Sequence, residues 1–461
     1  MGREWIIPAE SELRCEVKEN ETLVVHLHEG NAEIFGIELA HDRKYYFTGE
    51  ENIAVFTWYG CKLETDGTCQ SSAMYTSNET PMTALVNVHG QLEARRDVAL
   101  LNGDRGPRVL LAGPRECGQS TAARILAMYA ARLDRTPVLA DIDVAHSLVC
   151  SVSGCVGAIA VDDRCLSLEE NFDAATPLVH FFGHTSPEEN LEWYKQQVSS
   201  LASTIADKHA ADADGRASGL IVNTGAWNDQ GGGTHGLEIL HHAIEAFEID
   251  IVLVIGHDRL YASLQEWSNT RVVALKEKDT DNWRQPTAHK ALTIAKLPRS
   301  GGVVARTEAS RRRARRSLVH EYFYGKKVIV AGEEQPPRYR PHRQELSLSS
   351  CTFFSCGGVR LSESMRPLGQ EKAAQGGAAV LQPVPPSMEL EHAVLAVLQA
   401  QEGAAGPESN SSDGQRTPAN IAGFVYVVKL EQDLNTVTVL SPCPGKLPSL
   451  DFVVGSIKWV E

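Results

Sequence analysis

The sequence VLLAGPRECGQST at residues 109–121 is the starting point for interpreting the chain. Residues 109–112 form a short apolar run typical of a buried parallel strand, and the residues after 121 follow a helical pattern of apolar positions. Between them lies a loop bounded by Gly113 and Gly118. A strand, a glycine-bounded loop and a helix place backbone N–H groups and the helix dipole around phosphate oxygens. The segment therefore predicts a phosphate-binding loop in an α/β domain, although such a loop can also serve for packing alone.

The loop fits the pattern G-x-x-x-x-G-K-[ST] at every position except one. Gln119 stands where the pattern has lysine, and Ser120 keeps the hydroxyl that could ligate magnesium. The lysine normally lies along the β and γ phosphates and offsets charge in the transition state. Glutamine can donate a hydrogen bond but brings no charge. The missing charge alone predicts phosphoryl transfer slowed by about a thousandfold or more.

Two carboxylates, Asp141 and Asp143, follow the next expected strand at 137–140. Carboxylates at the C-terminal ends of parallel strands face the crevice where α/β sheets bind ligands. One of the two could hold magnesium or accept a proton from a hydroxyl group. The alternative is a pair of solvated loop side chains.

Six arginines fall within residues 306–316. The segment is compatible with a helix, in which Arg311 and Arg315 share a face. Such a run is typical of a solvated face or of a nucleic-acid patch. In phosphoryl-transfer enzymes an arginine-rich lid also closes over the phosphates.

The flanking regions indicate further domains. Residues 1–90 contain short β-type runs, including one at 85–88, separated by turn clusters about ten residues apart, which predicts a small sandwich or barrel. Residues 91–101 are helix-like. From 108 on, expected strands alternate with helical segments, which predicts a parallel sheet covered on both faces. Those strands are 137–140, 220–222, 251–255 and 271–275, and the helical segments include 189–207 and 235–247. Beyond 330 β character returns, with low-complexity loops at 369–379 and 399–418.

Composition excludes several classes of protein. The 461 residues are 43% hydrophobic and 22% charged, an ordinary globular balance. With 44 Lys and Arg against 59 Asp and Glu, the net charge of −15 excludes a global basic footprint for nucleic acid but not a local patch. No apolar run reaches the roughly 18–20 residues of a membrane span. The ten cysteines contain no CxxC pair, which argues against zinc. We expect a soluble, intracellular protein.

Several blocks of sequence in a fixed order carry a resemblance to a known family. They include AEIFGIEL at 32–39, AVFTWYGC at 54–61, RGPRVLLAGP at 105–114, SGGVVAR at 300–306 and TVLSPCP at 438–444. The chain resembles, over essentially its whole length, the Clp/Grc family of eukaryotic polyribonucleotide 5'-hydroxyl kinases. The kinase that the chain resembles doubles as a subunit of the pre-mRNA cleavage and polyadenylation machinery.

The resemblance implies three domains. These are an N-terminal β-sandwich at 1–104, a central α/β P-loop NTPase domain with a parallel sheet at 105–330, and a small C-terminal α+β domain at 331–461. Active members use ATP and Mg²⁺ to phosphorylate an RNA 5'-hydroxyl. As partners the resemblance implies cleavage and polyadenylation factor subunits, RNA within the complex and the tRNA-splicing endonuclease complex, with no membrane. It also implies that the protein is located in the nucleus.

The resemblance also assigns residues. Asp143, Arg311 and Arg315 correspond to catalytic positions, and Ser120 and Asp143 to metal ligands. Thr224 and Trp227 correspond to an RNA clasp. The nucleotide site comprises Glu12, which reaches the adenine in the family, with Gly113, Pro114, Arg115, Glu116, Cys117, Gly118, Gln119, Ser120 and Thr121.

Three departures from the family pattern fall within the catalytic apparatus. Gln119 replaces lysine, residues 145–147 replace a G-Q-G, and Ala226 replaces the clasp glycine. This selective loss implies a member that keeps its assembly role with impaired or lost kinase activity. One alternative is an active kinase in which Arg115 or a lid arginine replaces the lysine. Another is a nucleotide-independent RNA-binding module that uses Trp227 and the arginine run.

Overall fold

The computed structural model describes residues 2–226, 235–278, 292–326, 329–330, 333–356, 381–387, 390–399 and 420–460. The chain divides into two compact units. The first comprises 1–141, 158–177 and 205–311, and the second comprises 142–157, 178–204 and 312–461. Trp227, the loop expected at 369–379 and all but the first residue of the loop expected at 399–418 lie outside the described residues. None of the described helices combines the length and the apolar character needed to cross a membrane.

The first unit begins with two antiparallel sheets that form the expected β-sandwich. One has the order β1 (Arg3–Ile7), β8 (Cys61–Gly67), β3 (Thr22–Gly30) and β6 (Lys44–Thr48). The other has the order β5 (Ile37–Glu38), β4 (Glu33–Ile34), β7 (Asn52–Thr57), β2 (Ser11–Glu16) and β9 (Met74–Ser77). Leu13, Leu23 and Leu63, from three of these strands, are fully buried in one hydrophobic cluster. The prediction of a sandwich is therefore confirmed.

A long helix, α1 (Met82–Asn102), follows the sandwich and ends at Gly103, whose φ of 68° is left-handed. The strand expected at 85–88 was wrong, because these residues belong to α1. The buried positions of α1 are spaced by three or four residues and form a helical stripe, which overrides the β propensity of the two valines. They are Met82, Leu85, His89, Leu92, Arg96 and Ala99.

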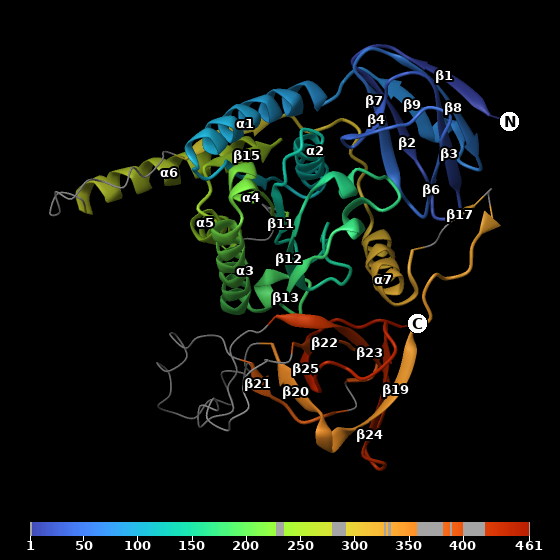
Figure 1. Cartoon of the computed structure of the whole chain (residues 1–461), viewed down its shortest axis with the longest axis vertical. Coiled ribbons are helices and arrows are strands. Elements are labelled where there is room, and N and C mark those ends of the chain that lie inside the picture. Colours follow the sequence, from blue (N-terminus) through green and yellow to red (C-terminus); the bar gives the residue numbers. More distant parts are fainter. Residues whose placement is uncertain are drawn as a thin grey trace. The chain divides into compact units, whose positions relative to one another are not determined.

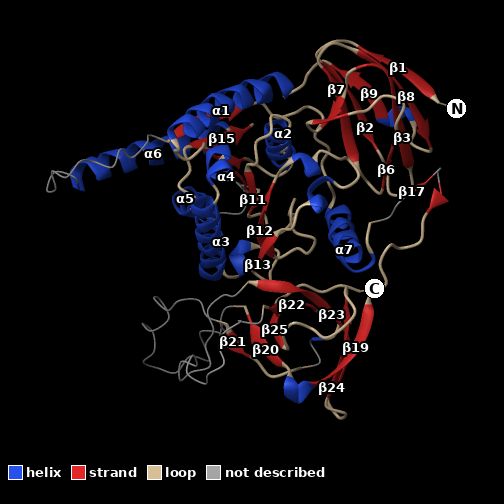
Figure 2. Cartoon of the chain, in the orientation of Figure 1, coloured by secondary structure: helices blue, strands red, loops and turns tan. Residues whose placement is uncertain are grey.

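The first unit continues as a parallel sheet, which confirms the predicted α/β class (Figures 1 and 2). Its strands run in the order β11 (Val138–Asp141), β14 (Leu220–Asn223), β10 (Arg108–Ala112), β15 (Ile251–Ile255) and β16 (Thr293–Leu297). Its helices include α2 (Gln119–Ala131), α4 (Ala213–Ser218), α5 (His235–Ala246) and α6 (Asp258–Lys278). The strand expected at 271–275 was wrong, because α6 continues through it. The edge strand β16 was missed, since only Leu297 in it is buried.

Three elements, β12 (Cys155–Ala160), α3 (Leu191–Ala211) and α7 (Glu308–Tyr324), cross the division between the units. Short 3-10 helices lie at Ser71–Ala73, Asp163–Cys165, Asn171–Ala174, Pro187–Glu189 and Leu348–Ser350.

The second unit contains β13 (Leu178–Phe181), the pair β17 (Ile329–Val330) and β18 (Glu333–Glu334), and a larger sheet. That sheet has the order β19 (His342–Ser347), β24 (Thr436–Ser441), β23 (Ile421–Glu431), β22 (Val394–Leu398), β25 (Asp451–Val454), β20 (Thr352–Ser355) and β21 (Gln382–Pro383). Phe323 of α7 stacks on Trp459 with ring centroids 5.7 Å apart. Helix α7 and the C-terminal segment thus share aromatic packing within the second unit.

Candidate functional site

The loop between β10 and α2 curls tightly, and its geometry explains both glycines. Gly118, at the start of α2, has a left-handed φ of 88°. A Cβ added to Gly113 would lie 2.5 Å from the Cys117 sulfur and 3.1 Å from the main-chain oxygen of Ile255. A side chain at either position would therefore strain the loop. The predicted context of the loop, a strand before and a helix after, is confirmed, and the helix N-terminus provides N–H groups and a positive dipole end for an anion.

Gln119 is turned into the protein rather than left exposed. Its side chain is only 7% exposed. Its amide nitrogen donates to the main-chain oxygens of Leu111, at 3.0 Å, and Thr224, at 2.6 Å, and lies 2.9 Å from the Thr224 hydroxyl. Carbonyl oxygens only accept, so they fix which end of the amide faces them. The residue at the lysine position therefore ties the start of α2 to the ends of β10 and β14.

A second polar group joins the ends of β11 and β14 to α2. The Asn223 amide nitrogen donates to Asp141 Oδ1 at 3.0 Å and to the Ser120 hydroxyl oxygen at 3.3 Å. Asp141 is fully buried. A carboxylate and a hydroxyl directed at one donor are oxygen ligands of the kind that Mg²⁺ prefers. The structure thus brings Ser120 together with Asp141. Asn223 was missed, although a polar residue at the end of a buried strand is a signal that the sequence offers.

Asp143, the expected catalytic carboxylate, belongs to the second unit. Its Oδ1 accepts hydrogen bonds from the backbone N–H groups of Ala145, at 2.9 Å, and His146, at 3.2 Å. This arrangement shapes the turn after β11. Arg315, on α7, also belongs to the second unit. The catalytic roles of both residues, and the role of Asp143 as a metal ligand, stay predictions.

Arg311, at the start of α7, forms an ion pair with the phosphate loop. Its Nη1 lies 2.8 Å from Glu116 Oε1, and its Nε lies 3.2 Å from Glu308 Oε2. The backbone N–H of Arg306 also donates to Glu116 Oε1, at 2.9 Å. Arg311 and Glu116 are 15% and 22% exposed, so water screens this pair only partly. A phosphate that binds here must therefore compete with Glu116 for Arg311. Arg115, in the same loop, is exposed.

Glu12 on β2 faces the same region from the sandwich. Its two carboxylate oxygens accept hydrogen bonds from Arg14 Nε, at 2.6 Å, and from the Thr80 hydroxyl, at 2.9 Å. A Cβ on Gly302 would lie 2.6 Å from Arg14 Nε, and a Cβ on Gly118 would lie 3.5 Å from Val303. Residues 302–303 therefore lie between the sandwich pair and the loop. An adenine contact by Glu12 stays a prediction.

The other predicted site residues differ in burial. Cys117 and Thr224 are buried, and burial raises the pKa of the Cys117 thiol. Pro114, Ser120 and Thr121 are half-buried. The first unit thus gathers the whole predicted loop, Glu12, Thr224 and Arg311 in one body.

Comparisons with known families match three successive regions of the chain. Residues 6–99 match an N-terminal beta-sandwich domain of polyadenylation factor. Residues 113–285 match the mRNA cleavage and polyadenylation factor CLP1 P-loop, and residues 339–461 match the pre-mRNA cleavage complex II protein Clp1.

Individual relatives match along nearly the full chain. A protein CLP1 homolog of Culex quinquefasciatus is 34% identical over 99% of this chain and 97% of its own length. The polyribonucleotide 5'-hydroxyl-kinase Clp1 of Rattus norvegicus is 33% identical over 98% of this chain and 95% of its own length. Among solved structures, a wild-type Clp1p–Pcf11p complex has a chain with a TM-score of 0.76 at 23% identity, covering 100% of this chain and 99% of that one. This last match bears on the fold alone.

Proposed function

The chain belongs to the Clp1 family of mRNA cleavage and polyadenylation factors, and from this premise we propose that it is an mRNA 3'-end processing subunit with impaired or lost RNA 5'-hydroxyl kinase activity. The family couples a P-loop domain to a role in the cleavage complex. In this proposal the protein keeps the assembly role and binds ATP, but it does not transfer the phosphoryl group efficiently.

The direction of the Gln119 amide carries the proposal. Both amide protons are used by acceptors inside the protein, on Leu111 and Thr224. The side chain carries no charge to place beside a transferring phosphoryl group. Loss of one preorganised electrostatic contact in an active site typically slows turnover by about a hundredfold to a thousandfold.

The loop still fits the phosphates of a nucleotide. Its backbone geometry and the start of α2 would hold phosphate oxygens. Ser120 and Asp141 would hold Mg²⁺, because their oxygen atoms lie close together, at 3.3 and 3.0 Å from the same Asn223 nitrogen. Mg²⁺ supplies charge neutralisation to the phosphates when it is bound. Arg311 would gain a phosphate partner in place of Glu116.

The test is transfer of labelled γ-phosphate from ATP to a 5'-hydroxyl RNA oligomer. We expect transfer by the full-length protein to be at least about a hundredfold below that of the rat relative in the same assay. Asp143→Ala supplies the background level. Gln119→Lys restores a charge at the lysine position, and we expect it to raise transfer above that background.

If the wild type transfers phosphate at a rate close to that of the rat relative, the proposed loss of activity is wrong. ATP binding is read separately, from the rise in melting temperature with ATP and magnesium. A protein that binds ATP but transfers nothing agrees with the proposal. A protein that shows neither effect retains only the assembly role.

An active kinase is the second candidate, and the Arg311–Glu116 pair favours it. A guanidinium already lies 2.8 Å from a side chain of the phosphate loop and could supply the missing charge. If the wild type is active, Arg311→Ala removes that activity. Arg115→Ala tests the other candidate arginine, and loss of activity there instead would assign the charge to Arg115. Arg95→Ala, at an exposed arginine of α1, is the control and leaves the activity unchanged.

The proposed partners are cleavage and polyadenylation factor subunits in the nucleus, with RNA met inside that complex. The Clp1p chain was solved together with Pcf11p, which makes a Pcf11-type subunit the first candidate. Affinity purification of the tagged protein from nuclear extract should recover such subunits. Recovery of the tRNA-splicing endonuclease alone would instead place the protein in tRNA processing.

A further inference from the structure

The outer face of the sheet β1-β8-β3-β6 carries two histidines next to a glutamate. Val25 and Leu27 of β3 are fully buried, so His26 and His28, which alternate with them, lie on the opposite face. His26 is the direct cross-strand partner of Glu64 on β8. Three potential metal ligands therefore share one face of two neighbouring strands.

An irregularity in the strand pairing brings His28 toward the other two residues. The register of β3 against β8 shifts between Leu27 and Glu29, so His28 is the extra residue of a bulge. Bulges re-aim side chains, often at functional positions. His28 Nε2 lies 3.3 Å from Glu64 Oε2, and the centroids of the two histidine rings are 4.2 Å apart. One ligand atom from each of the three residues lies within 4.8 Å of the others.

One ring nitrogen of this cluster accepts and donates no hydrogen bond within the part of the chain that the structure describes. In the described part of the chain, His26 Nε2 is buried and has no hydrogen-bond partner. A buried polar atom without a partner costs free energy, and a bound cation would remove that cost. Gly2 leaves room for the carboxylate, because a Cβ there would overlap Glu64 Oε1. Any longer side chain at residue 2 would push Glu64 away from the histidines.

We propose that His26, His28 and Glu64 bind one Zn²⁺ ion on the N-terminal sandwich. Two imidazole nitrogens and a carboxylate oxygen form a three-ligand zinc set whose fourth position stays open to water or to another molecule. These ligands suit Zn²⁺ better than Mg²⁺, which prefers oxygen. The absence of a CxxC pair argues only against cysteine-based zinc, since no ligand here is a thiolate.

The neighbouring lysines leave room for a cation. Lys62 pairs with Glu4 at 3.3 Å, so its charge is matched. Lys44 stands opposite His26 on β6, but it is exposed and its long side chain can extend its ammonium into water. The site belongs to the sandwich alone and does not depend on whether the phosphate loop binds ATP.

The test is a calorimetric titration of the EDTA-stripped full chain with zinc chloride. We expect one Zn²⁺ bound by the wild type that is lost, or weakened at least about tenfold, in His26→Ala, His28→Ala and Glu64→Gln. His235→Ala is the matched control, because His235 and Glu238 form an exposed pair at 3.2 Å that belongs to no three-ligand group among the described residues. Zinc bound by cysteines persists in all four variants and can be subtracted.

A melting curve provides the second readout. Zinc should raise the melting temperature of the wild type and of His235→Ala, but not that of the three site variants. If the site variants bind zinc as tightly as the wild type does, the assignment is wrong. Should His26→Ala fail to fold, His28→Ala and Glu64→Gln decide the matter, since both residues are about one-third exposed.

Discussion

Gln119 stands at the lysine position of the phosphate loop, and its contacts in the structure are with the protein itself. A lysine at this position serves phosphates, whereas the glutamine serves the carbonyl groups at the ends of β10 and β14. Replacing Gln119 should therefore lower the free energy of unfolding even when no ligand is present.

We expect Gln119→Leu to lower the free energy of unfolding of the apo-protein by about 1–3 kcal/mol. The change leaves the main-chain oxygens of Leu111 and Thr224 with fewer donors in a buried setting. Gln265→Leu is the control, because Gln265 is an exposed glutamine on α6 whose loss should cost less than about 0.5 kcal/mol. Urea unfolding measures both variants. Equal stability of the two would mean that the Gln119 contacts contribute nothing.

The phosphate loop was predictable because its signal is local. A strand, two glycines and a helix are contiguous in residues 109–131, and the structure keeps that order. The network around Gln119 was not predictable in the same way. Its partners Asn223 and Thr224 lie at the end of β14 and directly after it, more than one hundred residues later. They reach α2 only because β14 lies beside β10. Strand order, rather than residue type, creates those contacts.

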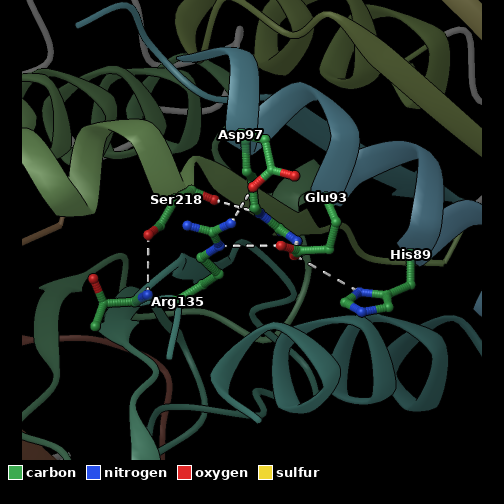
Figure 3. A network of polar contacts seen from close by, with 7 residues as sticks. His89, Glu93, Asp97, Arg135 and Ser218 are labelled. Atoms are coloured by element: carbon green, nitrogen blue, oxygen red, sulfur yellow. Dashed lines mark hydrogen bonds and ion pairs between the residues drawn. The ribbon is translucent and has the colours of Figure 1, made fainter. Parts of the chain in front are cut away.

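At the scale of elements, α1 is held to the parallel-sheet domain by a buried charge network (Figure 3). Arg96 is 1% exposed, pairs with Glu93 and donates from Nε to the main-chain oxygen of Ser218 at 2.8 Å. Arg135, just before β11, reaches the same Glu93 at 3.0 Å. These contacts link α1 to the end of α4 and to the segment before β11.

We expect Arg96→Met to destabilise the protein by about 3 kcal/mol. The side-chain volume is roughly kept, but Glu93 and the Ser218 carbonyl lose a buried partner. Arg95→Met changes the exposed neighbour on the same helix and should cost less than about 0.5 kcal/mol. Urea unfolding followed by circular dichroism compares the two. A small effect at Arg96 would mean that Arg135 alone satisfies Glu93.

The same helix shows why element type was misjudged in places. Residues 85–88 contain two β-branched valines, which favour a strand when they are viewed in isolation. The apolar period becomes visible only over the full length of α1, from Met82 to Ala99. Tertiary burial of one helical face outweighs such a short local preference.

At the scale of the whole molecule, the negative net charge does not describe the local surroundings of the arginines. The net charge of −15 describes the chain as a whole, whereas Arg311 is matched locally by Glu116 and Glu308. The buried histidines differ again, because their effect depends on staying uncharged. His180 lies in the second unit and His209 in the first, so both units share this dependence on pH.

We expect the folded chain to lose stability between about pH 6.5 and pH 4. Burial lowers the pKa of His180 and of His209 to about 4 in the folded chain, whereas an unfolded histidine titrates near 6.5. Between these values only the unfolded chain takes up the proton. Stability is therefore complete above about pH 6.5 and falls until about pH 4, by as much as about 3 kcal/mol per histidine.

His209→Leu should flatten this pH dependence, because it removes one of the buried histidines that must stay neutral. His41→Leu, at an exposed histidine, keeps the wild-type slope. Urea unfolding at steps of half a pH unit from 7.5 to 4 measures the slopes. Asp212, whose pKa is lowered by the backbone N–H of Gly215, loses its contribution only below about pH 4, so it does not obscure the comparison. An unchanged slope in His209→Leu would show that His209 already takes up its proton in the folded chain.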